Sequence, residues 1–195
     1  MRDTIHRRKT AWPILLTVLA TLCLALPGPA RAADELGSFI EGLAGGWVAD
    51  SIETPRGPMP FALLFERKDD GTLAAHTPWD RETFVDLAFR RASDGRWVLA
   101  EHARLPEAGD QWSILVPAGV AAGARRFVDA ADSGRLAVDL AVREDIMEIT
   151  VWVRGKRHVH GVLRRVPPEA LPGLRERLAA LGSRPHEPFG REGRP

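Results

Sequence analysis

The chain has 195 residues, and its 27 Lys and Arg nearly balance 26 Asp and Glu, for a formal net charge of +1 at pH 7. The basic residues are scattered, which argues against the concentrated positive footprint of a nucleic-acid-binding protein. The single cysteine, Cys23, lies in the N-terminal segment, so the rest of the chain is not expected to use disulfides, thiolate chemistry or cysteine-bound metals.

The first 32 residues are organised like a secretory signal peptide. Three basic residues at 7–9 precede an apolar run at 14–26, and Ala-Arg-Ala follows at 30–32. The apolar run is short for a membrane anchor. We therefore expect cleavage after Ala32 and export to the periplasm or the medium, with no stable membrane span remaining. The Arg pair at 7–8 leaves a twin-arginine route open.

A short helix is predicted next, from Asp34 to Ala44. Four apolar residues follow the i, i+3, i+4, i+7 spacing of one helical face, and Gly45-Gly46 ends the pattern. These four residues are Leu36, Phe39, Ile40 and Leu43.

The segment from Trp47 to Val166 has the short apolar runs and frequent turns of an all-β domain. We predict ten strands: Trp47–Thr54, Pro60–Arg67, Thr72–Thr77, Glu82–Arg91, Arg96–Arg104, Gln111–Val116, Ala124–Ala130, Arg135–Val142, Ile146–Arg154 and Lys156–Val166. The connections are too short for crossover helices, so neighbouring strands should pair antiparallel. The sequence therefore predicts an antiparallel up-and-down β-barrel of about eight to ten strands within residues 33–166, since closure removes exposed strand edges.

Turn residues predict the strand registers and hence the two faces of the sheet. Asp-Gly loops at 68–72 and 92–96 are typical of three-residue turns that end in a left-handed glycine. The second loop turns Glu101 inward beside Leu87. The remaining inward aromatic and apolar residues of interest are Phe61, Phe65, Trp79, Phe89, Trp97 and Leu99. The opposite face is expected to meet water, and it carries His76, Asp86, Arg90, His102, Asp139, Arg143, Glu148 and Thr150.

The C-terminal part divides at the Pro167-Pro168 pair, which cannot continue a strand. Leucines at helical spacing predict a helix within 167–182 that lies on the barrel. The alternative is that this helix is presented to a protein partner. Residues 183–195 are rich in Pro, Gly and Arg, which predicts a disordered tail.

The start of the β segment resembles a known family. A short helix followed by Gly45-Gly46-Trp47 is similar to the Gly-x-Trp opening of lipocalins and the wider calycin barrels. The resemblance implies a barrel that can hold a small apolar molecule, closed at its base by Trp47 packed against Arg164 or Arg165. The internal Thr-Asp-x-x-Tyr motif of that family is missing, and the chain contains no Tyr.

A second, narrower resemblance is to the bacterial ten-stranded haem barrels of the nitrobindin type. Those proteins carry a haem-ligating histidine on the last strand, roughly where His158 or His160 lies. Their glycine-rich opening motif is not matched, since Ala49 and Ser51 occupy the corresponding region.

The direction of His158 and His160 depends on the turn near Gly155. A two-residue turn at Gly155-Lys156 would place both histidines inside the barrel. A loop one residue longer would place them outside and turn Val159 and Leu163 inward. We favour the outward arrangement, because two imidazoles in an apolar core need partners.

The sequence contains no nucleophile elbow, phosphate loop or zinc-protease helix, so we expect a non-catalytic protein without a cofactor or an established metal site. We expect a small apolar or amphiphilic ligand to bind inside the barrel, with Glu101 orienting its polar end. The predicted ligand-binding residues are Phe61, Phe65, Leu87, Phe89, Trp97, Leu99 and Glu101. The alternatives are a filled barrel acting as a cell-envelope interaction module, and haem or metal binding through His158 and His160.

Overall fold

The computed structural model describes residues 29–78, 83–105, 109–121 and 123–181. Three expectations therefore concern residues outside this description. They are most of the signal peptide, the inward direction of Trp79 and the disordered tail. The barrel belongs to a compact unit that runs from Gly37 to Pro195. No helix in the described part of the chain has the length and apolar character needed to cross a membrane.

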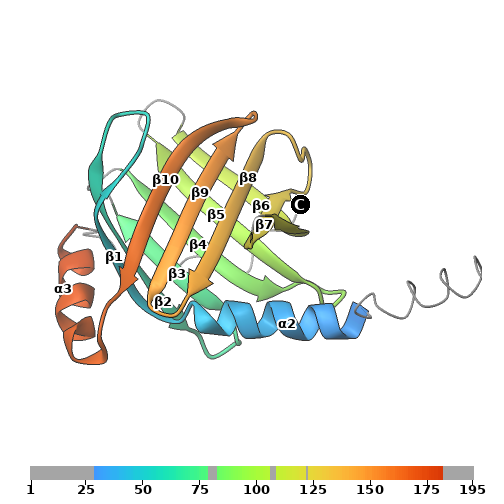
Figure 1. Cartoon of the computed structure of the whole chain (residues 1–195), viewed down its shortest axis with the longest axis horizontal. Helices are drawn as coiled ribbons and strands as arrows, with labels where there is room; N and C mark the ends of the chain where they lie inside the picture. The colour runs from blue at the N-terminus through green and yellow to red at the C-terminus, as the bar shows by residue number, and fades with distance from the viewer. Residues whose placement is uncertain (1–28, 79–82, 106–108, 122, 182–195) are drawn as a thin grey trace, which may run out of the picture. The chain divides into compact units, whose positions relative to one another are not determined.

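The predicted all-β architecture is confirmed. Ten strands form one closed barrel in which each strand pairs antiparallel with the next and the last pairs with the first (Figure 1). The strands are β1 (Gly45–Ile52), β2 (Met59–Arg67), β3 (Leu73–Pro78), β4 (Phe84–Arg91), β5 (Trp97–Leu105), β6 (Gly109–Ala121), β7 (Ala124–Asp129), β8 (Leu136–Arg143), β9 (Ile146–Val153) and β10 (Lys156–Arg165).

The Asp-Gly turns set the registers as the sequence predicts. Gly71 and Gly95 both have φ of 81°, a left-handed conformation that glycine adopts without steric cost. The second turn pairs Leu87 with Glu101 across β4 and β5. Since alternate residues of a strand point to opposite faces, Glu101 lies on the inner face with Leu87.

A helix precedes the barrel. It is α2 (Pro29–Gly42), which begins earlier than the predicted start at Asp34. The side chains of Ile40 and Leu43, at and just beyond its C-terminal end, are fully buried. The end of the barrel next to these residues is called the α2 end below.

Trp47 and Arg165 close the α2 end. These two residues are directly paired between β1 and β10, and the Arg165 guanidinium stacks 4.1 Å from the centre of the Trp47 ring. The same guanidinium donates hydrogen bonds of 2.9 Å to the carbonyl oxygens of Gly42 and Ala44, while the Trp47 indole donates to Leu43 O at 2.8 Å. Of the two arginines considered from the sequence, Arg165 is the one that packs on the tryptophan.

A second helix covers part of the outer wall. After a short 3₁₀ turn (Pro168–Ala170), α3 (Leu171–Leu181) packs against β1, β2 and β3 beside the barrel (Figure 1). Leu174 and Leu178 are buried there with Leu64 and Val166. Gly46 permits this approach, because a Cβ at that position would come within 2.6 Å of Leu174. The apolar side of α3 is thus used against the barrel.

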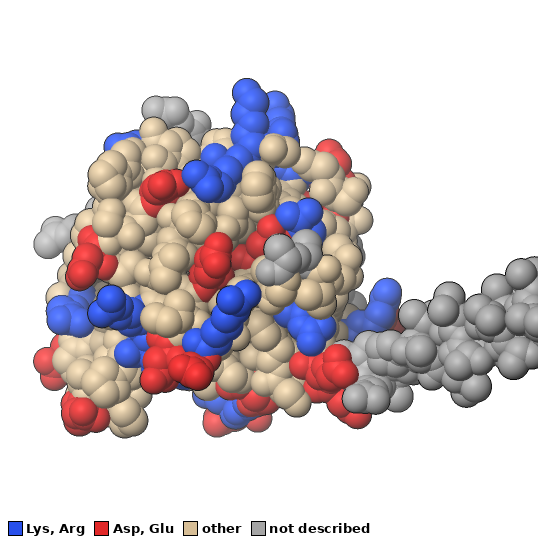
Figure 2. Space-filling model, viewed as in Figure 1, with Lys and Arg blue, Asp and Glu red and all other residues tan. Residues whose placement is uncertain are grey.

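The charged groups of the outer wall are mixed in sign. Lys and Arg alternate with Asp and Glu over the face seen in Figure 2. Several of them pair across strands, as Arg126 does with Asp139 through two hydrogen bonds of 2.7 and 2.6 Å. Arg175 of α3 likewise bonds Glu66 of β2 at 2.7 Å.

The closure at the α2 end leads to a first prediction. Replacing Arg165 by Ala should lower the free energy of unfolding by about 2 kcal/mol, because the variant loses a cation–π contact and two hydrogen bonds that tie the last strand to the end of α2. The matched control is Arg164→Ala, since Arg164 is an exposed neighbour. Urea denaturation measures both variants, and equal losses would contradict this account of the closure.

Candidate functional site

The inner face of the barrel is densely filled near the α2 end. Phe65, Phe89 and Phe127 form a continuous aromatic row there, with ring centres 6.1 and 5.5 Å apart. Further inward side chains with almost no solvent exposure are Trp47, Leu63, Leu73, Leu99, Leu115, Met147 and Leu163. This half of the interior is a packed core.

The other half of the interior is accessible to solvent. Inward residues of five strands keep part of their surface exposed, although their neighbours along the same strands, nearer the α2 end, are buried. They are Phe61 of β2, Val85 of β4, Glu101 of β5, Val151 and Val153 of β9, and Val159 of β10. Solvent therefore reaches the inner face at the end away from α2, which we call the accessible half.

The predicted ligand-binding residues are divided between these two halves. Phe65, Phe89 and Leu99 belong to the packed core. Trp97 is also buried near the α2 end, where the Arg91 guanidinium lies 4.4 Å from its ring centre.

Phe61 and Glu101 line the accessible half, whereas Leu87, which pairs with Glu101, is buried.

Glu101 is the central polar group of the accessible half. Its strand pairs it with Ser113 of β6, and the Ser113 hydroxyl hydrogen-bonds to its carboxyl. Burial raises the pKa of Glu101 to about 7, although the positive charge of Arg135 opposes the shift. Near neutral pH this carboxyl group is therefore close to half protonated.

Arg135 and Asp129 complete the inner polar cluster. Arg135, just before β8, donates to Ser113 Oγ at 2.9 Å and forms a close ion pair with Asp129 at the end of β7. Burial disfavours the charge of Asp129, but the backbone amides of Asp132 and Ala131 and the Arg135 side chain hold its pKa below the usual range. Asp129 is thus ionised near neutral pH and forms an ion pair with Arg135.

The sequence analysis did not identify Ser113, Asp129 or Arg135. A usable signal existed for two of them, because Ser113 and Asp129 stand two residues from the inward Leu115 and Phe127, respectively, and therefore share their face. Arg135 lies in the β7–β8 connection, whose path the strand alternation does not predict.

His158 and His160 lie on the outer wall. The turn before them consists of Arg154 and Gly155, with φ of 50° and 73°, as in a type I′ hairpin. Val153 pairs with Lys156, and an extra residue between Arg157 and Val159 then shifts the register so that Val151 faces Val159. The structure thus shows the outward arrangement that we favoured. It results from a two-residue turn followed by a bulge, not from the longer loop considered in the sequence analysis.

The two histidines also differ in their surroundings. His158 is exposed, whereas His160 is half-buried and its Nδ1 lies 3.1 Å from the Thr150 hydroxyl. Neither imidazole lines the barrel interior, which removes the geometric basis for a haem ligand inside the barrel.

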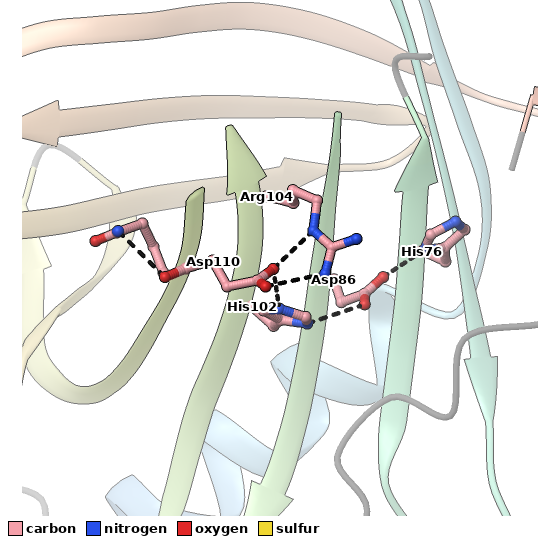
Figure 3. A network of polar contacts seen from close by, with 6 residues as sticks. His76, Asp86, His102, Arg104 and Asp110 are labelled. Atoms are coloured by element: carbon pink, nitrogen blue, oxygen red, sulfur yellow. Dashed lines mark hydrogen bonds and ion pairs between the residues drawn. The ribbon is translucent and has the colours of Figure 1, made fainter. Parts of the chain in front are cut away.

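A row of polar side chains crosses the outer face of β3 to β6 (Figure 3). His76 Nδ1 contacts Asp86 at hydrogen-bonding distance, and the other Asp86 oxygen lies 3.7 Å from His102 Nδ1. His102 Nε2 is in turn 3.2 Å from Asp110, which accepts two hydrogen bonds from Arg104 at 2.8 and 2.9 Å. The row thus links four adjacent strands by alternating imidazole and carboxylate groups.

This row corrects the expectation that the outer polar residues meet water. Asp86 is 0% and His102 3% exposed, and Thr150 is also buried, although all three point outward as predicted. Part of the reason is aromatic cover: Trp112 stacks on the His102 ring at 3.7 Å with an interplanar angle of 4°, and Phe84 meets its edge at 5.0 Å. Within the described residues, no group of three or more His, Cys, Asp or Glu side chains has the arrangement of a metal site.

Comparisons with known proteins do not assign the chain to a family. No protein-family model matches it, and no match was found among curated proteins or solved structures.

The outer row leads to a second prediction. Asp86→Ala should lower the free energy of unfolding by about 3 kcal/mol, because it leaves two histidines without the buried carboxylate between them. Asp110→Ala is the control, since the Asp110 side chain is 46% exposed and its loss should have a much smaller effect. Thermal or urea denaturation distinguishes the two, and an Asp86 variant as stable as the control would show that the row contributes little.

Proposed function

We propose that this protein is an exported, lipocalin-like barrel that binds a small apolar or amphiphilic molecule without catalysis. The accessible half of the interior is the proposed binding site, and Phe61, Val85, Val151 and Val153 provide its apolar lining. Export rests on the signal-like composition of the first 32 residues.

The observation that carries the proposal is the contrast between the two halves of the inner face. Aromatic and branched side chains fill the α2 half, whereas in the other half five apolar inward residues, Phe61, Val85, Val151, Val153 and Val159, remain partly exposed beside buried neighbours. A barrel of ten strands is wider than the eight-stranded barrels whose interior is just filled by side chains or one small ligand. Apolar surface beside a few polar groups is the usual composition of a small-molecule site.

The lipocalin-like part of the proposal is supported by the base of the barrel. The stacking of Arg165 on Trp47, next to a helix that ends at Gly42, corresponds to what the sequence resemblance implies. A closed barrel of antiparallel strands is also consistent with the resemblance.

The proposal is tested by filling the accessible half. Nile red, a neutral apolar dye, should bind the purified protein with an increase in fluorescence. Val151→Trp should weaken its binding at least about tenfold, because the larger side chain would occupy inward space at the accessible end. Val162→Trp is the matched control, since Val162 lies on the neighbouring strand but is 51% exposed on the outer wall.

Fluorescence titration of the three proteins gives the answer, with far-ultraviolet circular dichroism to verify that each is folded. Failure of the wild-type protein to bind the dye, or equal binding by the Val151 variant, would contradict a ligand site in the accessible half.

A further inference from the structure

We propose that the ligand carries a cationic nitrogen on an apolar body, and that this nitrogen pairs with the carboxylate of Glu101 in the accessible half. The inference rests on the proposed function and adds the chemical class of the ligand. An alkylamine or a related organic amine is the simplest molecule of this class.

The first argument is the charge balance of the inner polar cluster. Two carboxylates, Glu101 and Asp129, face one guanidinium, that of Arg135. Arg135 is engaged by Asp129 through an ion pair and by Ser113 through a hydrogen bond. Glu101 is thus left with a hydroxyl partner, and the charge of Arg135 that acts on it is opposed by that of Asp129. The cluster therefore lacks one cation whenever Glu101 is ionised.

The second argument is that the other described elements around Glu101 supply no further buried charge. Among the described residues, the one further charged side chain on the inward face of the accessible half is that of Lys156, which pairs with Val153 at the β9–β10 turn and is exposed. The other inward side chains there are apolar or neutral apart from this cluster. These apolar and neutral side chains include Ile52 of β1, Met59 and Phe61 of β2, Thr77 of β3, Val85 and Leu87 of β4, Ala103 of β5, Gln111 and Ser113 of β6, Leu136 and Val138 of β8, Val151 and Val153 of β9, and Val159 of β10. The nearby Arg157 is paired with Glu53 at 3.0 Å and is exposed.

The third argument concerns the kind of cation. Calcium or magnesium would require several oxygen ligands, and the cluster offers no such set beyond the carboxyl group of Glu101. An organic amine needs one counter-charge, and its hydrocarbon part would cover the apolar lining. An anionic ligand would meet a carboxylate and an arginine that is already engaged, so its charge would be repelled or left unpaired.

Proton release should accompany binding. The free Glu101 carboxyl has a pKa of about 7, so near neutral pH about half of the molecules must lose a proton before they can pair with an amine. An alkylamine stays protonated up to pH 8, since the amino group of lysine has a pKa of about 10.4. Binding of the amine should therefore be about tenfold tighter at pH 8 than at pH 6.

The experiment compares three probes with the same tail. Octylamine, octanol and octanoate are titrated against the Nile red complex at pH 6 and pH 8. Octylamine should displace the dye most strongly at pH 8 and lose about tenfold in affinity at pH 6, whereas the affinity of octanol should change little. Calorimetry in two buffers of different ionisation enthalpy should show release of about half a proton per octylamine bound at pH 7.

Glu101→Gln should abolish both the preference for octylamine and its pH dependence, while octanol still binds. Glu148→Gln is the matched control, because Glu148 is an exposed residue of the outer wall and its substitution should leave all affinities unchanged. The proton count on the wild-type protein keeps the test valid if the Glu101 variant does not fold.

The possible results separate the two proposals. If octanol or octanoate competes as well as octylamine at both pH values, the amine class is overturned while ligand binding stands. The same holds if octylamine binds without proton release. If neither the dye nor any probe binds, the proposed function fails and the amine inference with it.

Discussion

The stacking of Arg165 on Trp47 is the contact on which the rest of the structure depends. It joins the first and last strands of the meander at the point where the barrel closes, and its hydrogen bonds to Gly42 and Ala44 fix the end of α2 beside the same residues. A barrel closed in this way has one end occupied by an arginine, a tryptophan and buried helix residues. Any ligand must therefore approach the interior from the other end, where the β9–β10 turn lies.

The interior changes in character along the barrel axis. Near the α2 end it contains rings and branched chains in direct contact, and this packing provides the hydrophobic stabilisation of the fold. Toward the other end, some apolar residues are partly exposed, and the polar cluster of Glu101, Ser113, Asp129 and Arg135 begins. Because the pKa of Glu101 is raised to about 7, its ionisation at higher pH destabilises the empty barrel. A cationic ligand that pairs with the carboxylate would offset this cost, which is consistent with a functional role for the residue. The polar row on the outer face is a separate feature that connects β3 to β6 and is shielded by Trp112 and Phe84.

Much of this architecture could be predicted from the sequence because local rules act on it directly. The Asp-Gly turns impose left-handed glycines, and these set the registers that bring Glu101 to the inner face. Other features depend on contacts between distant residues. The exposure of outward groups such as Asp86 and His102 depends on the size of neighbouring side chains, and strand alternation carries no information about it. The position of Arg135 depends on a connection without periodicity. The histidines of β10 depend on a bulge after the turn, which the turn residues alone do not predict.

The central claim is that Glu101 is a partly desolvated carboxyl group whose cationic partner is the ligand, and carbon-13 NMR of labelled glutamate side chains tests it most directly. A titration of the free protein should show one glutamate with a midpoint near pH 7, which disappears in Glu101→Gln. Saturation with octylamine should lower that midpoint well below 7, whereas octanol should not. A Glu101 midpoint near 4.5 in the free protein, the ordinary value for this side chain, would contradict the account.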